Sequence, residues 1–238
     1  MPFRRFRFRH MQTSVTVLAE SEQSYNLVVK NILEARNQVE RAIAEEPLFY
    51  SSLEPLPEDM WPELEVPRRM CEASELAGVG PMAAVAGGIA QYAVERVKEL
   101  VVIDNGGDIV MRNDRLIAGI FPSNFGVKLE FQRPEIYSVC TSSGRYGHSI
   151  SFGDCDASVV LAKDGFVADA FATALGNEIK PGFGREEIEN ALKDFWKRAK
   201  KYVDGIVVIK DGYVGVAGRV ELVKANFDER LITKWSLF

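Results

Sequence analysis

A carboxylate and a hydroxyl stand four residues apart in an alanine-rich stretch, at Asp169 and Thr173. On a helix over Phe166–Asn177, residues i and i+4 share one face, so the two oxygen groups would point the same way. Such a pair suits a hard cation such as Mg²⁺, which takes few protein ligands and keeps waters or phosphate oxygens. The rest of that face is alanine, so no partner for the carboxylate is evident. The simpler alternative is that Asp169 only interacts with the helix dipole.

The stretch from residue 141 to residue 148 combines three consecutive hydroxyl groups, on Thr141, Ser142 and Ser143, with glycines, a cation and a histidine. Histidine accepts a proton near neutral pH, which makes His148 a candidate general base. A lone histidine beside a strand is also commonly structural, and the segment by itself leaves both interpretations open.

A glycine loop precedes a second alanine-rich helix. Gly78 and Gly80 lie just before Pro81, which is typical of a first helical turn. Free backbone N–H groups at the start of a helix favour phosphate binding. Alanine and glycine continue through the helix, which equally fits tight packing against a neighbouring element.

A second glycine-rich segment is the turn Asn105-Gly106-Gly107-Asp108. Two glycines between strands make a tight turn, and this requirement alone would explain them. The flanking amide and carboxylate make the turn unusually rich in oxygen ligands and hydrogen-bonding groups, so a binding site is the other interpretation.

Composition excludes several classes of protein. The 29 basic and 34 acidic side chains give a net charge of −5 without the basic surface that nucleic acid requires. No run of about 18 apolar residues is present, so we expect no membrane span. Three widely spaced cysteines without a CxxC pair favour a reduced, cytoplasmic protein. Alternating Arg and Phe over Arg4–Arg9 predict an edge strand rather than a signal peptide.

Hydrophobic periodicity and turn residues predict the elements that must hold these groups. A long helix is expected from Ser21 or Ser24 to about Glu45, and a proline-rich connector over 47–67. The long helix has one expected buried stripe, formed by Leu27, Val28, Ile32, Leu33, Val39 and Ile43. Further helices are expected at Arg68–Ala77, Pro81–Lys98, Phe166–Asn177 and Arg185–Lys201. Strands are expected at Arg4–Arg9, Met11–Ala19, Val101–Ile103, Ile109–Met111, Leu116–Phe121, Val127–Phe131, Ile136–Cys140, His148–Ser151, Ala157–Ala162, and in a closing meander of Ile206–Lys210, Tyr213–Val216 and Arg219–Val223.

Strands therefore come in runs, with helices inserted in pairs. This order is typical of an α+β fold with largely antiparallel sheets and helices packed on them. The length permits one large domain, and no repeat or clear linker divides the chain. We expect residues 1–238 to form a single domain.

Taken together, the four segments resemble the ApbE-like superfamily of flavin transferases (FAD:protein FMN transferases), and most closely a small, soluble, uncharacterised branch of it. The superfamily motifs are an Asn-Gly-Gly-Asp turn, a Thr-Ser-Gly stretch followed by a histidine, and an Ala-Asp-x-x-(Ala/Ser)-Thr-Ala helix. They occur here in that order between Val101 and Asn177. The small branch adds the stretches Gly78–Ala83 and Gly147–Ser149. The resemblance implies an ApbE-like domain over the whole chain.

The resemblance also implies a reaction. Asp169 and Thr173 would hold Mg²⁺ at the diphosphate of FAD, where the metal neutralises developing charge. His148 would accept the proton from a Thr or Ser hydroxyl of an acceptor protein, FMN would be transferred to that hydroxyl, and AMP would leave. The residues expected to bind FAD are Gly78, Gly80, Asn105, Gly106, Gly107, Asp108, Thr141, Ser142 and Ser143.

One departure from the superfamily pattern keeps two alternatives open. The transferases follow their histidine with Asp-Pro-x-Thr-Gly, whereas this chain has Ser149–Gly153 with a different sequence. The first alternative is a hydrolase that splits the FAD pyrophosphate with water as acceptor. The second is a protein that binds a flavin or nucleotide without catalysis. In each case the expected partner is FAD or a related dinucleotide, with neither nucleic acid nor membrane.

Overall fold

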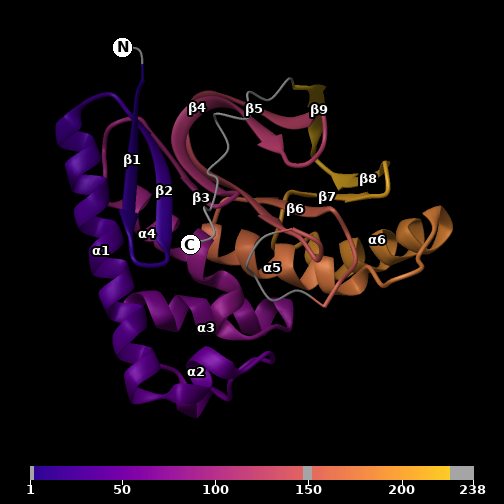
Figure 1. Ribbon diagram of the computed structural model, residues 1–238, viewed down its shortest axis with the longest axis horizontal. Coiled ribbons are helices and arrows are strands. Elements are labelled where there is room, and N and C mark those ends of the chain that lie inside the picture. The colour runs from indigo at the N-terminus through magenta and orange to yellow at the C-terminus, as the bar shows by residue number, and fades with distance from the viewer. Residues whose placement is uncertain (1–2, 147–151, 226–238) are drawn as a thin grey trace.

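The computed structural model describes residues 3–146 and 152–225, which form the α+β architecture that the sequence predicts (Figure 1). The helices are α1 (Glu22–Glu45), α2 (Pro47–Ser51), α3 (Glu65–Ala77), α4 (Val85–Glu95), α5 (Gly165–Glu178) and α6 (Arg185–Ala199), with the 3-10 turns η1 (Glu58–Met60) and η2 (Pro81–Ala84). The strands are β1 (Arg4–His10), β2 (Thr13–Ala19), β3 (Val101–Asn105), β4 (Asp108–Ile120), β5 (Phe125–Ser142), β6 (Ala157–Ala162), β7 (Gly205–Lys210), β8 (Tyr213–Gly218) and β9 (Glu221–Lys224).

One continuous antiparallel sheet contains all nine strands, in the order β1 to β8 with β9 paired to β5. Each strand from β1 to β7 pairs with the next strand along the chain, including β2 with β3 and β6 with β7, which helices separate in the sequence. The predicted closing meander is wrong for its last strand, because β9 leaves β8 and pairs with the hairpin end of β5 at Phe125–Lys128. β4 and β5 are also single long strands, each of which the sequence analysis divided in two. The predicted strand His148–Ser151 lies outside the described residues.

The helices cover one face of the sheet. Figure 1 shows α1 beside the β1–β2 hairpin and α5 and α6 running below β6, β7 and β8. Apolar residues on this face of the sheet form the larger core together with the helices. A second core lies on the opposite face, where β3 to β7 contribute Val102, Met111, Val127, Leu129, Tyr137, Val159 and Val207.

Helix α1 begins where the sequence predicts. The hydroxyl of Ser21 accepts a hydrogen bond from the Ser24 N–H at 3.0 Å and so caps the helix. The predicted buried stripe is partly wrong, because Leu27 and Leu33 are 37% and 39% exposed. Polar Asn31 and Gln38 lie on the buried face instead, since their amides bond to the Ala93 carbonyl and to the Tyr92 hydroxyl.

The proline-rich connector over 47–67 contains more regular structure than the sequence analysis expected. Pro47 begins α2 rather than only ending α1, and α3 starts at Glu65 with Pro67 in its first turn. Proline fits there because the first N–H groups of a helix have no partner within it.

In the described part of the chain, no single helix is long and apolar enough to cross a membrane. Only α3 and the η2–α4 segment taken together, with a bend of 104° between them, are long and apolar enough.

Helices α4 and α5 pack closely against each other. A Cβ added at Gly87 would lie 2.8 Å from the Cβ of Asp169 and 3.1 Å from the Cys140 sulfur. A Cβ at Gly88 would overlap the ring of Phe166. The alanine and glycine run of α4 is therefore explained by a second helix packed against it.

Replacing Gly87 with alanine is expected to lower the free energy of unfolding by about 1–3 kcal/mol, the usual cost of overpacking. The added methyl group meets the backbone carbonyl of Gly165 as well as side chains, and backbone cannot move aside cheaply. Urea unfolding measures the loss. Gly184→Ala is the matched control, because its methyl group would meet only the flexible carboxylate of Glu187 at 3.2 Å. A Gly87→Ala protein as stable as the parent would contradict the close approach of the two helices.

Candidate functional site

Two acidic side chains from distant parts of the chain lie close together beneath the surface. Asp108 is the first residue of β4, Asp169 lies in the second turn of α5, and each is 8% exposed. Burial raises the pKa of Asp108 well above its usual value, and the nearby charge of Asp169 raises it further. Carboxylates in such a setting favour a shared proton or a bound cation.

Asp169 is held by the start of α4. Its Oδ2 accepts a hydrogen bond from the Gly87 N–H at 2.8 Å. Burial raises the pKa of Asp169 to about 7, although the N–H groups of Gly87 and Ala86 oppose this by stabilising the carboxylate. The side chains on this face of α5 offer no partner for the carboxylate. The partner is a backbone N–H group, which leaves no mark in the pattern of side chains.

The Asn105–Asp108 turn reaches the same helix start. The Asn105 amide nitrogen donates to the Ala86 carbonyl at 3.0 Å, and the Thr141 N–H donates to Asp108 Oδ1 at 3.2 Å. Gly106 and Gly107 have φ angles of 76° and 107°, so the turn needs glycine for its backbone conformation. The structure thus brings the turn, Thr141 and Asp169 together across three segments.

Cys140 lies at the centre of this arrangement, and the sequence analysis gave it no role in the site. Its side chain is fully buried, and this burial raises the pKa of its thiol. The nearby charges of Asp108 and Asp169 raise it further. Its sulfur is 3.8 Å from the Gly165 carbonyl oxygen at the first turn of α5. A small side chain at this position lets β5 approach both helices.

The other residues expected at the site take different positions. Thr173 lies one helical turn after Asp169 and is buried. Ser142 is also buried, and its carbonyl accepts a hydrogen bond from the Ser158 hydroxyl. The Ser143 hydroxyl accepts from the N–H groups of Arg145 and Tyr146 and donates to the Cys155 carbonyl. His148, the expected base, lies outside the described residues.

Each glycine of the loop before η2 has a local structural reason. Gly78 ends α3 in the left-handed region, with a φ of 74°, as is common just after a helix. A Cβ at Gly80 would overlap the carbonyl of Ser52 in the connector. These contacts explain both glycines without a ligand, so their expected contact with phosphate stays a prediction.

The donor set at this place fits a magnesium ion. Asp169 and Thr173 present a carboxylate and a hydroxyl from one side of α5, and Asp108 adds a second carboxylate. Over residues 3–146 and 152–225, no three His, Cys, Asp or Glu side chains gather as a metal site. Magnesium does not need three such side chains, because it keeps several waters and takes further oxygen ligands from the phosphates of a substrate.

The buried carboxylates predict an unusual dependence of stability on pH. A folded-state pKa of about 7 for Asp169, against 3.8 ordinarily, means that the folded protein holds this proton more tightly than the unfolded chain. Protonated Asp169 therefore adds to the free energy of unfolding below pH 3.8, and this contribution is lost as the pH rises toward 7. In metal-free protein, Asp169→Asn should flatten this fall, which urea unfolding across the window measures. Equal slopes in both proteins would show that the carboxylate is not buried as described.

Comparison with known sequences gives consistent matches over nearly the full length. The sequence model of a family described as AbpE bacteria matches residues 1–216. A protein of Archaeoglobus fulgidus named UPF0280 protein is 48% identical, over 97% of this chain and 99% of its own. Another of the same name, from Methanosphaerula palustris, is 40% identical over 98% of this chain and 99% of its own.

Solved structures share the fold. A variant of the flavin transferase ApbE from Vibrio cholerae superposes with a TM-score of 0.50 at 14% identity, covering 92% of this chain and 97% of that one. The apo form of the flavinyl transferase ApbE from Pseudomonas stutzeri gives 0.50 at 13% identity, covering 91% and 94%. At such low identity the likeness establishes the fold alone.

Proposed function

The chain belongs to the AbpE bacteria family, and from that membership we propose that it is a magnesium-dependent enzyme acting on the diphosphate of FAD. In this proposal the enzyme transfers FMN to a Thr or Ser hydroxyl of an acceptor protein and releases AMP. The names of the structural neighbours, flavin transferase and flavinyl transferase, support the choice of reaction. The flavin as substrate and magnesium as cofactor are part of the proposal.

The observation that carries the proposal is the pair of buried carboxylates, Asp108 of β4 and Asp169 of α5, which are near enough for the charge of Asp169 to raise the pKa of Asp108. Two such groups repel each other, and they would also repel the diphosphate of FAD. A divalent cation removes both repulsions at once, and hard oxygen ligands favour magnesium over softer metals. A site for an uncharged ligand would need no second buried carboxylate.

In this proposal Asp169 and Thr173 would hold the metal, and Asp108 would add a second negative charge near it. When bound, magnesium would neutralise charge on the diphosphate. The Asn105–Asp108 turn and residues 141–143 would lie against the nucleotide. The loop of Gly78 and Gly80 would approach its phosphate oxygens, with the Gly78 and Val79 N–H groups donating to the Ser74 carbonyl in the structure. These assignments follow the residues shared with the superfamily.

The proposed reaction balances as a phosphoryl transfer. His148 takes the proton of the acceptor hydroxyl, whose oxygen bonds to the phosphorus on the FMN side. The bond from that phosphorus to the bridging oxygen breaks, and AMP leaves with the bridging oxygen. Water in place of the hydroxyl would give free FMN and AMP instead.

Equilibrium binding and product analysis test this proposal together. We expect FAD to bind with quenching of flavin fluorescence only when MgCl₂ is present, and we expect added acceptor protein to become covalently flavinylated. Free FMN without protein-bound flavin would indicate the hydrolase. A yellow protein that binds FAD and forms no product would indicate the binder, and the absence of FAD binding with MgCl₂ would refute the proposal.

A further inference from the structure

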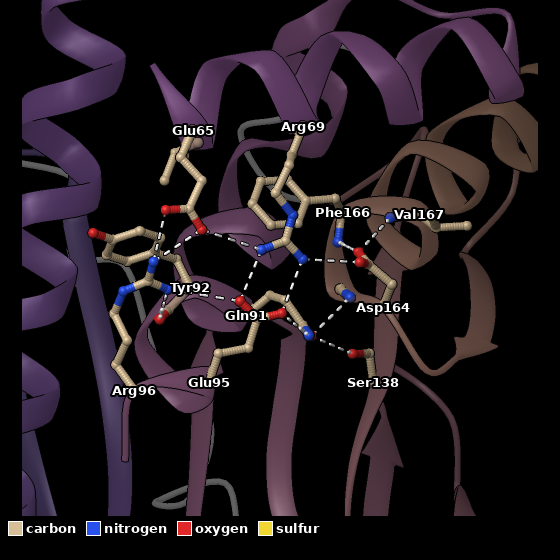
Figure 2. Close-up of polar contacts among 12 residues, drawn as sticks. Glu65, Arg69, Gln91, Tyr92, Glu95, Arg96, Ser138, Asp164, Phe166 and Val167 are labelled. Carbon is tan, nitrogen blue, oxygen red and sulfur yellow. Dashed lines mark hydrogen bonds and ion pairs between the residues drawn. The ribbon is translucent and has the colours of Figure 1, made fainter. Parts of the chain in front are cut away.

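A half-buried arginine connects three helices, α3, α4 and α5. Arg69 projects from α3, as Figure 2 shows, and forms a two-pronged pair with Glu95 at the end of α4, at 2.7 and 2.9 Å. The same guanidinium reaches Asp164 at the start of α5, at 3.0 Å. Arginine suits this position because its planar fork binds carboxylates in a fixed geometry.

Asp164 also caps α5. Its Oδ1 accepts hydrogen bonds from the N–H groups of Phe166 and Val167, at 2.8 and 3.3 Å. One oxygen of the carboxylate therefore holds the helix start while the other binds Arg69. The Asp164 carboxylate therefore joins the start of α5 to Arg69 of α3.

Gln91, on α4, completes the connection. Its Oε1 accepts from the Gly165 N–H at 2.9 Å and from the Ser138 hydroxyl of β5 at 3.4 Å. Its Nε2 donates to Glu95 at 2.8 Å, so the amide is fixed at both ends (Figure 2). We call Arg69, Gln91, Glu95 and Asp164 the Arg69 network.

The Arg69 network ends at the point where α4 and α5 cross. Gly165, whose N–H binds Gln91, presents its carbonyl to Gly87, and a Cβ on either glycine would clash with the other helix. The guanidinium also lies 4.2 Å from the centre of the Phe166 ring, which fills the space beside Gly88. Gly87 in turn donates its N–H to Asp169.

We propose that the Arg69 network positions Asp169, by fixing where α5 crosses α4 and so where the Asp169 carboxylate meets the Gly87 N–H. Its members are not among the residues proposed to bind FAD or magnesium, and they act as positioning residues. The consequence for metal binding rests on the function proposed above, whereas the geometric claim does not. Groups that orient metal ligands from behind typically change metal affinity about 10–100-fold when they are lost.

Arg69→Met tests this role, because it keeps the length of the side chain and removes the fork. Two readouts apply: hydrogen exchange of the Gly87 N–H relative to the Val160 N–H in the core strand β6, and the MgCl₂ concentration that half-saturates FAD binding. The ratio of exchange rates cancels any uniform loss of stability. We expect the exchange rate of the Gly87 N–H to rise relative to that of the Val160 N–H. We also expect the half-saturating MgCl₂ concentration to rise by about tenfold or more.

Arg96→Met is the matched control. Arg96 binds both carboxylate oxygens of Glu65 through one nitrogen, at 2.9 and 2.7 Å, and lies over the Tyr92 ring. It approaches Glu95 only at 3.7 Å, and none of these contacts reaches α5. We expect both readouts to match those of the parent protein. Equal changes in the two variants would overturn the proposal, because stability alone would then explain them.

Asp164→Asn provides a second variant should Arg69→Met fail to fold. Asparagine keeps an oxygen for the helix cap but loses the charge that pairs with Arg69. We expect the same two changes, and an unchanged Gly87 exchange ratio in this variant would overturn the proposal. If the parent protein itself binds no FAD with MgCl₂, the proposed function fails, and the Gly87 exchange ratio alone still decides whether the network positions Asp169.

Discussion

Asp169→Asn is expected to abolish magnesium-dependent turnover of FAD while the protein stays folded. Asparagine can still accept the hydrogen bond from the Gly87 N–H, but it brings no negative charge to a cation. Loss of a group that only orients a metal ligand slows an enzyme by up to about 100-fold. Because Asp169 would bind the metal directly, we expect the rate to fall by more than that. The release of AMP at saturating FAD, measured over a series of MgCl₂ concentrations, shows the loss.

Asparagine is a better replacement here than alanine. Alanine would leave the buried Gly87 N–H without its partner, at a cost of about 1–3 kcal/mol, so lost activity could reflect lost stability. Asp194→Asn is the control, because this carboxylate is exposed on α6 and pairs only with Lys197 among the contacts described. An Asp169→Asn protein as active as the parent would rule out the metal assignment. An unfolded one would make the residue structural.

His148→Ala is expected to slow the chemical step by about 10²–10⁴-fold, the usual contribution of a general base. The affinity for FAD should change little, because the proposed role concerns the acceptor hydroxyl. Single-turnover release of AMP measures the rate, and flavin fluorescence measures the affinity.

His10→Ala is the matched control, since His10 is the other histidine of the chain and lies exposed at the end of β1. A loss of affinity in parallel with the rate would make His148 a binding residue. A rate equal to that of the parent would show that the reaction uses another base or none.

The elements that the sequence predicted well have strong local signals. The strand Ala157–Ala162 is confirmed at both ends because a largely apolar run, broken only by Ser158, stands between polar turns. Helix α1 is confirmed from its cap at Ser21 to Glu45. The buried face of that helix was partly wrong, since Asn31 and Gln38 are buried through hydrogen bonds to other elements that no local pattern records.

The candidate site was predictable in its residues and less so in its geometry. Asn105, Asp108, Thr141 and Asp169 stood out by type, and the structure brings them together at the start of α4. The groups that hold them are mostly backbone atoms, such as the Gly87 N–H and the Ala86 carbonyl. Such contacts depend on how two helices cross, which hydrophobic periodicity does not determine.

Cys140 and the Arg69 network were missed for a related reason. A single buried cysteine and a surface-type arginine are ordinary in a sequence of this composition. Their importance comes from long-range neighbours: Cys140 lies beside Asp108, and Arg69 bridges residues 26 and 95 positions further along the chain. Only the folded chain brings these partners within reach.

The most direct test of the proposed function is the release of AMP from FAD by the purified protein. The assay is run in MgCl₂ and in EDTA, with and without a cell extract as the source of acceptor protein. The proposal predicts AMP only where magnesium is present, with an equal amount of FMN found covalently attached to protein once the extract is added. FAD that stays intact in the presence of magnesium and extract would contradict it.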